Sequence, residues 1–119
     1  MAVHFRPFPK LPVYVCSRSG ELKWHRIAPL AVAGDPAVAF RRLGLVLAAM
    51  RRTTVVKATD EYLHAICRTP LGFKDDVECH LYAEDGVIHV RSASRIAPFW
   101  DFGVNRRRVA EIRRRLQAG

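Results

Sequence analysis

The chain has 119 residues, half of them hydrophobic and about a quarter charged, which is the composition of one folded domain rather than of a disordered segment. Its 20 lysines and arginines outnumber 11 acidic residues and give a net charge of +9, which favours an anionic partner. Three widely spaced cysteines indicate no disulfide framework, and no run approaches the roughly 18 apolar residues of a membrane span.

Residues 1–34 are predicted to form an irregular arm. Four prolines forbid a continuous helix there, namely Pro7, Pro9, Pro12 and Pro29. These prolines also interrupt the apolar core that a signal peptide needs, so we expect a cytoplasmic protein.

A helix is predicted over residues 35–52. Asp35 is a favourable N-cap and Pro36 suits the first helical position. Apolar residues recur at intervals of three and four and form one buried stripe: Phe40, Leu43, Leu47 and Met50.

Residues 53–96 are predicted to form two β-hairpins. The first has strands over residues 54–59 and 62–68 with a turn near Asp60. If the turn has two or four residues, alternation places one set of side chains against the helices: Thr54, Val56, Ala58, Leu63, Ala65 and Cys67.

The second hairpin turns at residues 83–86, Ala-Glu-Asp-Gly. Its alternation places one apolar set on the core face: Val77, Cys79, Leu81, Ile88 and Val90. Asp76 and Glu78 then share the opposite face with Arg91 and Arg95, and Glu78 lies opposite or diagonal to Arg91. Adjacent strand residues point to opposite faces, so Asp75 and Asp76 do not converge.

The last helix is predicted over residues 104–117, with Asn105 as its N-cap. Three arginines, Arg106, Arg107 and Arg108, occupy its first turn, where the helix dipole disfavours each cation by about 0.3–1 kcal/mol. A negative group is therefore expected nearby. It is either an internal carboxylate or a bound anion, and the internal candidates are Asp75, Asp76, Glu78 and Asp101.

These elements predict a single α+β domain over residues 1–119. We expect a four-stranded antiparallel meander with both helices packed on one face, preceded by the irregular arm.

Our leading hypothesis for function is a non-enzymatic binding domain that recognises an anionic small molecule or an acidic protein segment. Its candidate binding residues are Asp75, Asp76, Glu78, Arg91, Arg95, Asp101, Asn105 and Arg106. One alternative is nucleic-acid binding through the arginine-rich last helix, and another is a small enzyme that uses Asp76, Glu78 or His80. The histidines lie at no metal-ligand spacing and no phosphate-binding loop or nucleophile motif is present, so neither a metal nor a cofactor is expected.

Five blocks carry a family resemblance: HRIAPL at 25–30, EYLHA at 61–65, DDVE at 75–78, GVIHVRSASR at 86–95 and DFGVNRRRV at 101–109. Together they resemble the family called domain of unknown function 1499, from about Cys16 to Leu116. The resemblance implies a small α+β domain of a kind found in bacteria and plastids, without an established activity. The family's usual Pro-Asn-Cys-Val-Ser-Ser-like run reads VYVCSRSG here and retains Cys16, Ser17 and Ser19.

Overall fold

The computed structural model describes residues 14–18, 23–95 and 103–118. The elements in chain order are β1 (Tyr14–Cys16), the 3-10 turn η1 (Lys23–His25), β2 (Leu30–Ala31), α1 (Pro36–Ala49), β3 (Thr53–Ala58), β4 (Tyr62–Arg68), β5 (Lys74–Tyr82), the 3-10 turn η2 (Ala83–Asp85), β6 (Val87–Ser94) and α2 (Val104–Ala118). The predicted α+β class is confirmed.

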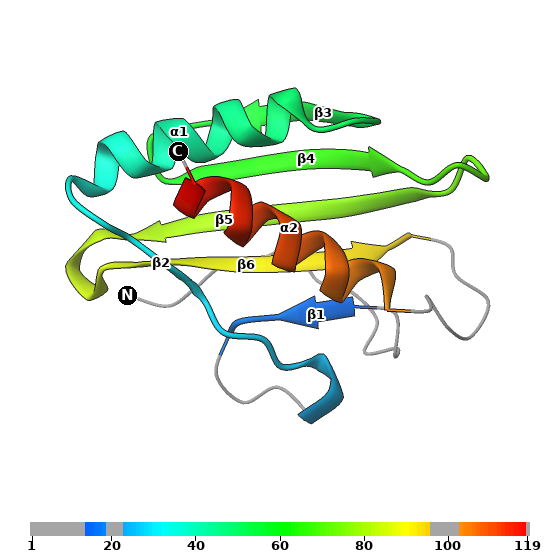
Figure 1. Cartoon of the computed structure of the whole chain (residues 1–119), viewed down its shortest axis with the longest axis horizontal. Helices are drawn as coiled ribbons and strands as arrows, with labels where there is room; N and C mark the ends of the chain where they lie inside the picture. Colours follow the sequence, from blue (N-terminus) through cyan, green and yellow to red (C-terminus); the bar gives the residue numbers. More distant parts are fainter. Residues whose placement is uncertain (1–13, 19–22, 96–102, 119) are drawn as a thin grey trace.

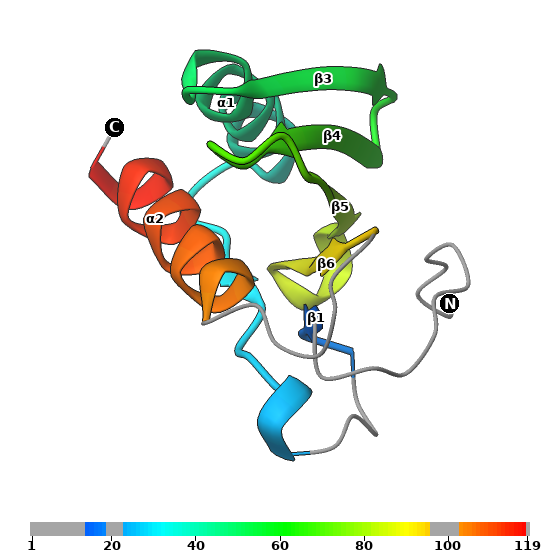
Figure 2. The ribbon, with the colours of Figure 1, turned by 90° about the vertical axis from the view of Figure 1, so that its right-hand side faces the viewer.

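The two helices form one layer and the antiparallel sheet forms the other (Figures 1 and 2). The sheet order is β1-β6-β5-β4-β3, and β2 pairs with β6 beside β1. Helix residues such as Phe40, Leu47 and Ile112 are buried in one core cluster with Val77 and Val90 of the sheet. Both helices therefore cover the same face, which we call the inner face; the other is the outer face.

The start of α1 matches its prediction. Asp35 caps it, because the Asp35 Oδ1 atom accepts hydrogen bonds from the backbone N–H groups of Ala37 at 2.8 Å and Val38 at 3.4 Å. Pro36 is the first helical residue, as expected. Neither helix in the described part of the chain is long and apolar enough to span a bilayer.

The β5–β6 hairpin also matches its prediction. Cys79 pairs with Val90 and Glu78 lies directly opposite Arg91. The turn comprises η2 and Gly86, whose φ of +65° lies in the left-handed region that glycine adopts without strain. The four-residue connection keeps the predicted register, so the apolar and charged sets fall on opposite faces.

The predicted faces of β3 are partly wrong. A β-bulge lies between Val55 and Lys57, so Val55 pairs with Ala65 and faces the core, whereas Val56 is exposed. Thr53 is aligned with Cys67, which moves Thr54 to the opposite face. A bulge adds one residue to one strand and reverses the alternation beyond it, which simple period-two reasoning cannot anticipate.

The predicted four strands are corrected to six, because the arm is not irregular throughout. Val15 of β1 pairs with Ser92, and Leu30 of β2 pairs with Ile88, both on β6. These strands have three and two residues, too few for alternation to appear in the sequence. A buried His25 imidazole also connects η1 to β1 within the arm, because its Nδ1 atom lies 2.9 Å from the Tyr14 carbonyl oxygen.

Candidate functional site

A row of polar side chains crosses the inner face at one end of the sheet. Strand pairing aligns Thr53, Cys67, Asp75 and Ser94 on β3, β4, β5 and β6. The Thr53 hydroxyl donates a hydrogen bond to the Cys67 sulfur, with the two atoms 3.5 Å apart. Apart from Ser92, the buried side chains on the rest of this face are mostly apolar, so the row marks a chemically distinct end of the core.

The first turns of α2 lie over this row. Arg108 reaches Asp75 on β5, with Nη2 2.7 Å from Oδ2, and both side chains are largely buried. Arg108 Nη1 also donates to Asn105 Oδ1 at 2.9 Å and to Ser92 Oγ at 3.2 Å. The contact with Asp75 is a close ion pair without directed hydrogen-bond geometry, and Asp75 Oδ1 has no hydrogen-bond partner among the described residues.

Asn105 is not the helix N-cap that the sequence predicted, because α2 begins at Val104 and Asn105 is buried within its first turn. The Ser92 hydroxyl donates to Asn105 Oδ1 at 2.8 Å, and Asn105 Nδ2 donates to Ser94 Oγ at 3.0 Å. The amide therefore joins α2 to two positions of β6. An asparagine near a helix start has the same sequence signature in either role, so the pattern alone could not separate them.

An open groove of about 390 Å³ lies beside this polar cluster. Arginines from three elements line it: Arg51 after α1, Arg68 at the end of β4, and Arg107 and Arg108 in α2. Among the described residues of the lining, the single carboxylate is that of Glu111, which contacts Arg115 on its own helix at 3.2 Å. Thr53 and Cys67 of the polar row complete the polar lining.

Burial holds the groove thiol in its neutral form. Desolvation raises the pKa of Cys67, although the hydrogen bond from Thr53 partly opposes that rise. A protonated, buried thiol is a poor nucleophile and a weak metal ligand. The arginines, rather than the cysteine, therefore dominate the chemistry of the groove.

The groove belongs to a strongly basic end of the domain. Exposed cations gather where α1 and β4 end and where β5 and α2 begin: Arg51, Arg52, Arg68, Lys74 and Arg107. We call this the basic end. The opposite end, at the two hairpin turns, exposes only acidic charge among the residues described there: Asp60, Glu61, Glu84 and Asp85.

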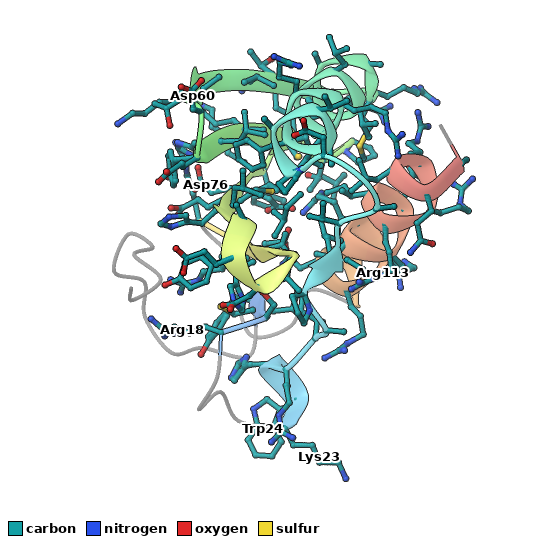
Figure 3. All side chains as sticks on the ribbon, turned by 90° about the vertical axis from the view of Figure 1, so that its left-hand side faces the viewer. Arg18, Lys23, Trp24, Asp60, Asp76 and Arg113 are labelled. Carbon is teal, nitrogen blue, oxygen red and sulfur yellow. The ribbon has the colours of Figure 1, made fainter. Side chains whose placement is uncertain are left out.

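Asp76 and Asp75 lie on opposite faces of β5, as predicted. On the outer face, Asp76 Oδ1 lies 2.7 Å from His64 Nε2, and Arg95 donates to both carboxylate oxygens at 2.8 and 3.0 Å. Figure 3 shows Asp76 on the side of the sheet away from Arg113 of α2. The hydrogen bond from Arg95 to Asp76 raises the pKa of the Arg95 guanidinium.

Glu78 and Arg91 continue the polar outer face. Glu78 accepts a hydrogen bond of 2.6 Å from the Tyr62 hydroxyl and lies opposite Arg91. The Arg91 guanidinium carbon lies 4.8 Å from the centre of the Tyr14 ring, and burial lowers the pKa of Arg91. His80 is also largely buried and lies opposite His89.

The predicted binding residues therefore do not share one surface. Asp75 and Asn105 lie inside, between α2 and the sheet, whereas Asp76, Glu78, Arg91 and Arg95 lie on the outer face. Arg106 is separate from both groups and donates to the backbone carbonyls of Trp24 at 2.9 Å and Arg26 at 3.1 Å. Asp101 lies outside the described residues.

The predicted binding residues did not include several residues that the structure brings together: Arg51, Thr53, Cys67, Arg68, Ser92, Ser94, Arg107 and Arg108. Of these, Arg107 and Arg108 were expected only to lie near a negative group. A partial signal existed, because Arg108 lies near the edge of the apolar stripe of the last helix. Within the described ranges, no three His, Cys, Asp or Glu side chains lie close enough together to hold a metal ion.

The profile of the protein family described as "Protein of unknown function (DUF1499)" matches residues 4–116 of the chain. The match confirms the resemblance seen in the sequence blocks and moves its start from about Cys16 to residue 4. Searches of curated proteins and of solved structures gave no significant match.

Proposed function

This chain belongs to the DUF1499 family of proteins of unknown function, and we propose that it is a binding domain for an anionic small molecule held in the arginine-lined groove. The observation that carries this proposal is the convergence of Arg51, Arg68, Arg107 and Arg108 on one cavity, where Glu111 is the one carboxylate among the lining residues that the structure describes. Guanidinium groups pair with phosphate and carboxylate in a bidentate manner, so several arginines around one hollow favour a ligand of that chemistry.

The buried contacts support a rigid floor for this groove. Asp75, Asn105 and Ser92 all contact the Arg108 guanidinium, which restricts its rotamers before any ligand arrives. Fixing a binding group in advance lowers the entropy lost on association. We therefore assign Asp75 and Asn105 a positioning role, and the outer-face residues Asp76, Glu78, Arg91 and Arg95 a structural one.

The helix start adds to the attraction for an anion. The first backbone N–H groups of α2 carry partial positive charge, and Arg107 and Arg108 lie in the same turns. The groove volume of about 390 Å³ falls at the small end of the range for small-molecule sites. A compound with one or two phosphate or carboxylate groups fits this combination of size and charge.

Binding can be tested by calorimetry and NMR titration with inorganic phosphate, citrate and a short polyglutamate peptide. Phosphate or citrate is expected to bind the wild-type chain. Arg68→Gln and Arg107→Gln should each weaken binding by at least about tenfold, since a charged hydrogen bond contributes about 1.5–3 kcal/mol. The matched control is Arg26→Gln, which removes an exposed arginine outside the groove lining and should leave the affinity unchanged.

Absence of binding by any probe at millimolar concentration, or equal losses in Arg26→Gln and the groove variants, would reject the groove as an anion site. Tight binding of polyglutamate alone would assign the groove to an acidic protein segment instead.

Nucleic-acid binding along α2 is the second candidate. The solvent side of this helix exposes several arginines: Arg106, Arg107, Arg114 and Arg115. Contacts with phosphates release counterions, so affinity should fall steeply with salt, with little dependence on sequence. Arg114→Gln should then weaken RNA or DNA binding without changing phosphate binding in the groove, and no retention on heparin at low salt would exclude this candidate.

A further inference from the structure

The strand β3 forms one edge of the sheet. It pairs with β4 on one side and ends the strand order, so its other side has no strand partner within the described part of the chain (Figure 1). The outward backbone N–H and C=O groups of such an edge are available to another strand. The opposite edge differs, because β1 and β2 both cover β6.

An apolar groove of about 700 Å³ runs beside this edge, between α1 and the β3–β4 hairpin. Apolar side chains provide most of its lining, including Phe40, Leu45, Val55 and Leu63. Leu45 is 71% exposed and Val56 on β3 is 49% exposed, although both are large apolar side chains. The same edge therefore combines unpaired backbone groups with exposed apolar surface, which is the combination found at association sites.

The charged residues at the two ends of β3 indicate which kind of strand could pair with it. Arg51 and Arg52 precede the strand, and Asp60 and Glu61 follow it, all of them exposed. No ion pair within residues 14–18, 23–95 and 103–118 involves any of these four side chains. An antiparallel neighbour of the same sequence would bring its acidic end beside the basic end of this strand, and symmetry would repeat that match. A parallel neighbour would place like charges together.

We propose that a second copy of this chain docks antiparallel along β3, so that the two sheets become continuous across a two-fold axis. Such an interface is self-complementary, because each copy supplies both the acidic and the basic end. The bulge at Val56 and the adjacent Lys57 restrict pairing with arbitrary strands, since bulges and lysines are the usual protection of an edge. A second copy carries the same bend and the complementary charge order.

A charge-swap experiment tests this assignment by light scattering and sedimentation, over roughly 1 µM to 1 mM protein at physiological salt. The wild-type chain is expected to reach twice its 13.5 kDa mass as concentration rises. Asp60→Lys with Glu61→Lys gives an edge with two basic ends, and Arg52→Glu gives one with reduced basic charge. Each variant alone should dimerise at least about tenfold more weakly, and an equimolar mixture should recover dimer in the form of the mixed species.

Arg26→Glu is the matched control, because it reverses an exposed charge on the arm and should leave the dimer unchanged. Circular dichroism of each variant checks that the fold is retained. A wild-type chain that stays monomeric throughout the concentration range would overturn the proposal and identify the bulge and Lys57 as edge protection. A dimer that is indifferent to both charge variants would overturn it as well.

Discussion

Arg108 on α2 and Asp75 on β5 form an ion pair inside the domain, with side chains only 11% and 2% exposed. One residue further along β5, Asp76 pairs with Arg95 on the outer face, where the Arg95 side chain is 38% exposed. Two consecutive carboxylates thus stabilise contacts on the two faces of one strand. Both carboxylates are buried, but the Arg95 side chain is more accessible to water than that of Arg108, and this difference sets the expected effect of removing each pair.

The substitution Asp75→Asn is expected to lower the free energy of unfolding by about 3 kcal/mol or more, because it leaves the Arg108 charge buried without its counter-ion. Urea denaturation measures the loss. Removing both partners in Asp75→Asn with Arg108→Met should cost less than the sum of the single changes. A loss below about 0.5 kcal/mol for Asp75→Asn would show that water reaches the pair.

The substitution Arg95→Gln is expected to lower the free energy of unfolding by only about 0.5–1 kcal/mol. Water screens the partly exposed Arg95 guanidinium, and Asp76 retains its contact with His64. The measurement is urea denaturation in low and high salt, where the effect should shrink at high salt. A loss as large as that of Asp75→Asn would contradict this distinction between the faces.

The substitution Asn105→Ser distinguishes the two roles of Asn105. Serine is as good an N-cap as asparagine, so a capping residue would tolerate the change. The bridge from Asn105 to Ser92 and Ser94 predicts instead a loss of about 1–3 kcal/mol, because the shorter side chain leaves buried polar groups unpaired. Thermal unfolding checks this, and Asn105→Ser with unchanged stability would restore the capping interpretation.

Stability is expected to fall in mild alkali because of the buried thiols. Burial raises the pKa of both Cys67 and Cys79. Below about pH 8.5 each thiol is protonated in both states. Above it, the unfolded chain releases protons that the native chain keeps, so unfolding becomes easier by up to about 1.4 kcal/mol per pH unit for each thiol.

Urea denaturation between pH 7.5 and about 9.5 measures this slope, before tyrosine and lysine titrate. Cys79→Ala removes one of the two thiols and should make the slope shallower. An equal slope in Cys79→Ala and the wild-type chain would assign the alkaline loss to other groups.

Alternation was the strongest signal in the sequence. The β5–β6 hairpin has regular alternation and a tight turn ending in Gly86, so its register and both of its faces were predictable. The separation of Asp75 from Asp76 followed from the same rule. The cap at Asp35 was equally local, because its hydrogen bonds reach only two and three residues ahead.

The remaining features depend on tertiary contacts. The bulge at Val56 and the pairing of β1 with β6 leave no local pattern in the chain. Arg106 and Arg113 donate hydrogen bonds to backbone carbonyls of the segment from Trp24 to Pro29. These carbonyls, rather than a carboxylate, therefore compensate part of the positive charge on α2. Carbonyls carry no sequence signature, and charge counting could not have located them.

The pairing of β1 with β6 also has a kinetic consequence. The hairpins from β3 to β6 join neighbouring segments, whereas Val15 and Ser92, which pair across β1 and β6, are separated by most of the chain. Closing so long a loop costs more entropy than closing a hairpin, so the meander should assemble early and β1 should dock late. In the native state the same edge should open first, and amide hydrogen exchange should be faster at residues 14–16 than at the centre of β5.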